Sequence, residues 1–168
     1  MKKHQKLMLT YGSITAGVSI ALTMLQYTLD AYNGKPLTVF LFGILPILLL
    51  ALCIFLGIYQ SKERSFRQMI KVGLGISILF AVIVAIFWVI FIKYIAPTHL
   101  ETINNLQLEA YKGQHPEVDS QTIEQMRTTM EGNTAPWIQF NLSLVSNLFF
   151  GLILSLLASS FFKIFNRN

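Results

Sequence analysis

Two histidine and glutamate pairs are the residues of this chain whose types and spacing first suggest chemistry. His99-Leu100-Glu101 and His115-Pro116-Glu117 repeat an H-x-E pattern, and imidazole nitrogens and carboxylate oxygens are ligands that zinc accepts. On a helix, however, residues i and i+2 do not share a face, and no cysteine stands beside either pair. We therefore expect both histidines to be solvent-exposed loop residues, and we predict no metal site.

The chain contains no motif of a common hydrolase or nucleotide-binding enzyme. H-E-x-x-H, G-x-S-x-G and a glycine-rich phosphate loop are all absent, and each of these motifs places a metal, a nucleophile or a phosphate in a defined local structure. We predict no catalytic residue, no cofactor and no enzymatic activity.

Composition indicates which solvent surrounds most of the chain. Of the 168 residues, 54% are apolar and only 12% are Asp, Glu, Lys or Arg, about half the charged share of a soluble domain. A chain with so little polar surface is expected to lie mostly in a lipid bilayer. The formal net charge of +5 does not indicate a nucleic-acid partner, because the basic residues are sorted along the chain as in membrane proteins.

Four long apolar runs predict four membrane-spanning helices. They cover about 7–29, 38–59, 72–95 and 137–162, and each holds the roughly 20 residues that a helix needs to cross about 30 Å of hydrocarbon. Asn33-Gly34 and Lys35-Pro36 are turn signals between the first two runs. Pro97 marks the end of the third run, and Pro136 is acceptable in the first turn of the fourth.

Residues 98–135 are polar and acidic but keep a helical period. Apolar residues recur every three or four positions from Leu100 to Ala110 and again from Ile123 to Met130. A Gly-Gln-His-Pro breaker separates these runs, and Asp119 or Ser120 is a suitable N-cap for the second. We predict an all-α fold with a single membrane domain over 1–168. It is an integral membrane four-helix bundle with an extracytoplasmic amphipathic helical hairpin, 98–135, which lies on the bilayer or packs on itself.

The charges outside the apolar runs predict the orientation. The two tails and the link between the second and third runs carry nine basic residues against one acid, whereas the opposite side carries four basic residues against seven acids. Because Lys and Arg accumulate in cytoplasmic segments, we expect both termini in the cytoplasm. The link contains a group that we call the basic collar, namely Lys62, Arg64, Arg67 and Lys71. Orientation during insertion explains the collar, and binding of anionic lipid headgroups is the alternative.

Small residues spaced by four predict the faces on which the helices pack, because such faces let backbones approach closely in lipid. The predicted helix-packing residues are Ser13, Gly17, Ala21, Gly73, Ser77, Ala81, Ala85, Asn147, Gly151, Ser155 and Ser159. We favour the contacts of a monomeric bundle, with Asn147 as the interhelical hydrogen-bond donor, over a homo-oligomer interface. Trp88, Tyr94 and Trp137 are expected at the membrane interface.

The predicted spans hold no charged residue in their middle, although proton-coupled transporters and voltage sensors need intramembrane ionisable groups. The leading hypothesis is a small non-enzymatic membrane protein whose partners are the bilayer and a protein that it contacts through residues 98–135. A component of a transport or channel assembly is one alternative. A lipid-modifying enzyme is another, and it needs the histidines and acids of residues 98–135 to converge.

Several segments together resemble a known family. Tyr11-Gly12, Lys71-Val72-Gly73, the run Phe87–Pro97 and Gly151-Leu152-Ile153 are similar to an uncharacterised family of four-span membrane proteins of Bacteroidota, domain of unknown function 4199. The resemblance implies a multi-pass protein of the bacterial cytoplasmic (inner) membrane. It implies no activity.

Overall fold

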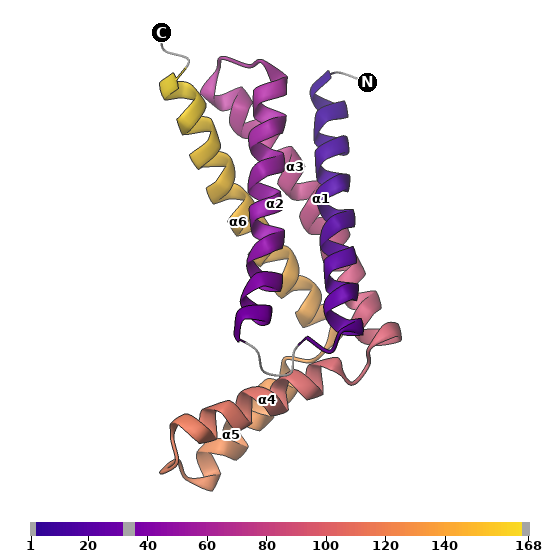
Figure 1. Ribbon diagram of the computed structural model, residues 1–168, viewed down its shortest axis with the longest axis vertical. Coiled ribbons are helices and arrows are strands. Elements are labelled where there is room, and N and C mark those ends of the chain that lie inside the picture. Colours follow the sequence, from indigo (N-terminus) through magenta and orange to yellow (C-terminus); the bar gives the residue numbers. More distant parts are fainter. Residues whose placement is uncertain (1–2, 32–35, 166–168) are drawn as a thin grey trace. The chain divides into compact units, whose positions relative to one another are not determined.

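The computed structural model describes the backbone of residues 3–31 and 36–165 and the side chains of residues 3–31 and 42–165. The described elements are all helical: α1 (Lys3–Thr28), α2 (Pro36–Ser61), α3 (Phe66–Ile90), the π-helix η1 (Phe91–Ile95), α4 (His99–Gln114), α5 (Ser120–Gly132) and α6 (Pro136–Phe165) (Figure 1). This confirms the all-α prediction. The predicted turn at Asn33-Gly34 and Lys35 lies outside the described residues.

Four of these helices are long and apolar enough to cross a membrane: α1, α2, α3 continued by η1, and α6. Each begins a few residues before the predicted run or ends a few residues after it, because backbone hydrogen bonding continues into the polar flanks. Helix α2 runs through Pro46 without interruption, and α6 begins at Pro136, as predicted.

The chain divides into two compact units. The bundle unit comprises the residues up to Val84 and those from Ser143 onward, and the hairpin unit comprises Ala85–Leu142. Helices α3 and α6 each run through both units. The single membrane domain over 1–168 stays a prediction.

Helix α3 contacts each of the other three helices of the bundle unit. Gly12 of α1 lies against Ile76, and Ile76 also lies against Gly57 of α2. Helices α2 and α6 meet through Phe55 and Phe162, whose ring centroids are 4.4 Å apart. The buried core consists of Ala16, Leu50, Ile54, Ile58, Met69, Val72, Ile76, Phe80, Ala158 and Phe162.

Helices α3 and α6 approach through two Gly-x-x-x-Ser motifs that face each other. A Cβ atom added at Gly73 would lie 2.6 Å from the Ser155 hydroxyl, and one added at Gly151 would meet the side chain of Ser77. The hydroxyl of Ser77 donates to the Gly73 carbonyl at 2.9 Å, and that of Ser155 donates to the Gly151 carbonyl at 2.6 Å. The lower-numbered residue of one helix meets the higher-numbered residue of the other, so the two helices are antiparallel here.

The packing face of α1 differs from the predicted one. Ser13, Gly17 and Ala21 are exposed, whereas the buried residues of this helix are Gly12, Thr15, Ala16 and Ser19. A spacing of four identifies a helix face, but α1 has small residues on two adjacent faces. The larger neighbours on α3 select the face that contains Gly12 and Ala16.

We predict that Gly151→Val lowers the thermal stability of the protein in detergent micelles, because the added side chain collides with Ser77 and separates α3 from α6. An overpacked interior position costs about 1–3 kcal/mol of unfolding free energy. Gly17→Val makes the same chemical change where nothing lies within 4 Å, and it should leave the melting temperature within about 1 °C of wild type. Equal effects of the two substitutions in a tryptophan-fluorescence melting experiment would contradict this account of the contact.

Within the hairpin unit, α4 and α5 pack against each other. Leu108 and Ile123 are buried, as expected for an amphipathic pair that packs on itself. The side chain of Asp119 caps α5 by accepting from the backbone N–H of Thr122 at 2.7 Å, which confirms the predicted N-cap. A side-chain hydrogen bond from Thr122, together with this backbone hydrogen bond, lowers the pKa of Asp119.

Candidate functional site

The structure does not bring the two histidine and glutamate pairs together. His99 is the first residue of α4 and His115 follows its last. The 16 residues of the helix therefore hold them about 24 Å apart at 1.5 Å rise per residue. Among the residues that the structure describes, no group of three His, Cys, Asp or Glu side chains could hold a metal ion. The two histidines, which the lipid-modifying alternative needs to converge, are separated by the length of α4, and the absence of enzymatic activity stays a prediction.

His99 is a buried residue, which corrects the expectation of an exposed loop histidine. Its side chain is 6% exposed and packs edge-on against Phe91, with centroids 5.2 Å apart, and against Trp88, at 5.8 Å. Burial lowers the pKa of His99 below its ordinary value of 6.5 because desolvation disfavours the imidazolium. His115 is exposed, and its ring lies 4.6 Å from that of Tyr111.

A hydrogen-bond chain joins three segments of the hairpin unit. The indole Nε1–H of Trp88, near the end of α3, donates to Oε1 of Gln139 in α6 at 3.0 Å. The amide of Gln139 in turn donates at 2.8 Å to the carbonyl of Asn133, the C-cap residue of α5. Trp88 also stacks on Phe91 at 5.5 Å. Trp88 is half-buried. Its side chain therefore packs within the hairpin unit, although the sequence predicted it at the membrane interface.

The π-helix η1 was not predicted. It determines which side chains at the end of α3 are buried and which are exposed. Its wide turn closes with the Ala96 N–H donating to the Phe91 carbonyl at 2.8 Å. Phe91 and Ile92 are buried, while Lys93 and Tyr94 are exposed. Short π-helical turns are frequent at functional sites because they redirect side chains without ending the helix.

A polar cavity in the hairpin unit, which we call the hairpin cleft, has a volume of about 760 Å³. It lies between η1, one face of α4, one face of α5 and the start of α6. Its lining residues are Ile92, Lys93, Pro97, Leu100, Glu101, Asn104, Asn105, Leu108, Arg127, Met130, Glu131, Thr134 and Pro136. On α5 the lining residues Arg127, Met130 and Glu131 share one helical face, but the other lining residues come from separate elements.

Charges of both signs line the hairpin cleft. Lys93 and Arg127 supply cations and Glu101 and Glu131 supply carboxylates, and all four side chains are exposed. In the described part of the chain, none of the four takes part in an ion pair. Two amides, those of Asn104 and Asn105, add donors and acceptors. The lining of the cleft therefore combines charges of both signs with hydrogen-bonding groups.

The remaining predicted residues lie as follows. Asn147 was expected to donate a hydrogen bond to another helix. Its amide instead donates to the Ser143 hydroxyl of its own helix at 3.3 Å. Tyr94 and Trp137 are 71% and 69% exposed, and their position at the membrane interface stays a prediction. Ala81, Ala85 and Ser159 are buried. The four collar residues Lys62, Arg64, Arg67 and Lys71 are exposed.

We predict that the stability contributed by His99 falls as the pH is lowered from about 7 to about 5. The folded state resists protonation, whereas the unfolded chain binds a proton near the ordinary pKa of 6.5, so acid favours unfolding. The His99→Gln variant should show a flatter melting-temperature profile over this range than wild type. His115→Gln, which changes an exposed imidazole, should keep the wild-type slope, and identical profiles for wild type and His99→Gln would refute the assignment.

Comparison with known proteins identifies a family. Neither a curated protein nor a solved structure matches the chain. The family model described as protein of unknown function (DUF4199) matches residues 10–163, a range that includes most of each of the four candidate membrane-spanning helices. The chain, with its four apolar helices and its α4 and α5 hairpin, therefore belongs to this family of membrane proteins, DUF4199.

Proposed function

We propose that this chain is a non-enzymatic membrane protein that binds a protein partner in the hairpin cleft. The observation that supports the proposal is the set of four exposed charges around the cleft, two of each sign, which form no ion pair within the described residues. Charges arranged in this way are available to a partner, and complementary charges favour association and select its register.

The chemistry of the lining favours a peptide segment with charges of both signs as the occupant. The amides of Asn104 and Asn105 can pair with backbone N–H and C=O groups. Leu100, Met130 and Pro136 supply apolar surface for side chains. A cavity of about 760 Å³ lies within the range of about 300–1,000 Å³ that is usual for binding pockets.

We also propose that the protein resides in the bacterial cytoplasmic membrane with both termini inside the cell, which places the hairpin cleft on the extracytoplasmic side. The start of α1, the link between α2 and α3 and the end of α6 lie at one end of the bundle unit (Figure 1). That end carries the basic collar and Lys163, and such enrichment of cations is typical of cytoplasmic segments.

The orientation predicts the activity of reporter fusions. Alkaline phosphatase fused after Gln114, in the hairpin, should be active because it folds outside the cytoplasm, whereas a fusion after Ser65, in the link, should be inactive. A cytoplasmic reporter such as green fluorescent protein should give the reverse pattern at the same two positions. Phosphatase activity at Ser65 together with none at Gln114 would invert the proposed topology.

Site-specific cross-linking tests the proposed partner site. A photoreactive amino acid at Asn105, which lines the cleft, should capture a partner in vivo, while one at Gln107, which is exposed on α4 but does not line the cleft, should not. Arg127→Glu should reduce the Asn105 product about tenfold, because a reversed charge repels the group that the arginine attracts. Lys112→Glu makes the same charge change outside the cleft and should preserve the product.

The outcomes of this experiment separate binding from mere proximity. Equal products from Asn105 and Gln107, or equal loss in the Arg127→Glu and Lys112→Glu variants, would overturn the cleft as the partner site. Absence of any product at Asn105 in cells that contain the correctly folded protein would overturn the proposed function itself.

A further inference from the structure

A second cavity lies in the bundle unit, among the end of α2, the residues that join it to α3, and the end of α6. We call it the link cleft, and its volume is about 680 Å³. We infer that the link cleft binds the phosphate headgroup of an anionic phospholipid. The inference does not depend on the hairpin cleft or on its partner.

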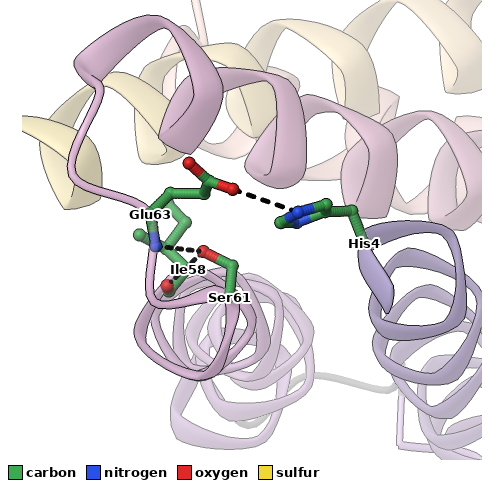
Figure 2. Close-up of polar contacts among 4 residues, drawn as sticks. All are labelled: His4, Ile58, Ser61 and Glu63. Atoms are coloured by element: carbon green, nitrogen blue, oxygen red, sulfur yellow. Dashed lines mark hydrogen bonds and ion pairs between the residues drawn. The ribbon is translucent and has the colours of Figure 1, made fainter. Parts of the chain in front are cut away.

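Lys62 and Arg64 supply the positive charge of the link cleft. Glu63 also lines the cavity, but its carboxylate is occupied. Oε1 of Glu63 lies 3.0 Å from Nε2 of His4. Figure 2 shows the two side chains pointing toward each other, with a dashed line for this contact. When the amide of Gln68 is turned so that its nitrogen faces Glu63, that nitrogen donates to both Glu63 oxygens, at 2.6 and 3.0 Å. Within the described residues, neither Lys62 nor Arg64 forms an ion pair with Glu63, so both cations are available to an anion.

The backbone of the link is held in a defined shape. The Ser61 hydroxyl donates to the Ile58 carbonyl at 2.7 Å and accepts from the Glu63 N–H at 3.3 Å (Figure 2). Between these residues Lys62 has φ of 57°, a left-handed conformation that residues other than glycine rarely adopt. A site whose cations project from an ordered turn is better organised for one headgroup than a flexible basic tail is.

The apolar part of the link cleft distinguishes a lipid from a soluble phosphate. Ile58, Met69 and Phe162 line it, and all three belong to the buried apolar core of the bundle unit. The Tyr59 ring lies 6.1 Å from that of Phe162. Cations beside an apolar wall at the end of spanning helices match a molecule with a phosphate at one end and acyl chains at the other, and basic pockets between spanning helices bind such headgroups.

The basic collar contains its own control for this site. Lys62 and Arg64 line the link cleft, whereas Arg67 and Lys71 carry the same charges, belong to the same collar and do not line it. General electrostatic attraction between the collar and an anionic leaflet would depend on all four residues. A specific headgroup site in the link cleft would depend on Lys62 and Arg64 alone.

The test measures lipid binding to the purified full-length protein in neutral detergent by native mass spectrometry, with phosphatidylglycerol and phosphatidylcholine as probes. Wild type should retain phosphatidylglycerol in preference to phosphatidylcholine. The double variant Lys62→Gln and Arg64→Gln should bind phosphatidylglycerol about tenfold or more weakly, since each cation near a headgroup contributes about fivefold. The matched double variant Arg67→Gln and Lys71→Gln should remain within about twofold of wild type.

Each alternative result contradicts the inference. Equal losses in the two double variants would show diffuse attraction by the collar, and no loss in either would remove the cations from the site. Full displacement of phosphatidylglycerol by inorganic phosphate would identify a soluble anion as the ligand. If the first double variant fails to fold, photoactivatable phosphatidylglycerol on wild type decides the matter: labels should map to residues 58–69 and Phe162, and labels elsewhere would overturn the site.

Discussion

The bundle unit depends on the close approach of α3 and α6. Apolar side chains gain little by leaving lipid for another helix, so association in a bilayer relies on packing and on satisfied polar groups. Gly73 and Gly151 leave room for the partner's serine, and each serine donates to the carbonyl of the glycine in its own helix. The contact thus combines a short distance between the two backbones with serine hydroxyls that each form a hydrogen bond. Because α3 also contacts α1 and α2, a change at this contact reaches every helix of the unit.

The hairpin unit is organised by different forces. Its helices carry many exposed polar residues, and aromatic packing and hydrogen bonds take the place of small-residue contacts. Trp88 contributes in both ways, since its ring stacks on Phe91 while its Nε1–H donates to Gln139. Through Gln139 and the carbonyl of Asn133, the end of α5 and the start of α6 are held in one arrangement. The hairpin cleft is lined from these segments, so its shape follows from contacts that involve none of its charged side chains.

Much of the fold could be predicted from the sequence, because apolar runs and charge distribution report directly on the surrounding solvent. The spans, the helical hairpin and the cap at Asp119 are of this kind. The packing face of α1 could not be predicted with the same success, since Gly12 and Ala16 form as good a small-residue pair as Ser13 and Gly17, and only the neighbouring helix distinguishes them. The burial of His99 depends on its packing against Trp88 and Phe91. These contacts require the π-helical turn between α3 and α4, which residue composition does not predict. The clefts escaped prediction for a related reason: their residues come from separate elements, and each element has an ordinary amphipathic pattern by itself.

The π-helix at Phe91–Ile95 has a consequence for how the hairpin cleft can change. A turn of this kind is equivalent to one residue inserted into an α-helix, and it rotates everything that follows by about 100° relative to an uninterrupted α-helix. Chain length at this point therefore determines that Ile92 and Lys93 line the cleft while Phe91 packs against Trp88 and His99. Substitution in this segment alters which groups a ligand meets. Loss of a single residue would instead turn a different side of the helix toward the cleft, so variation in length is constrained here more tightly than variation in residue type.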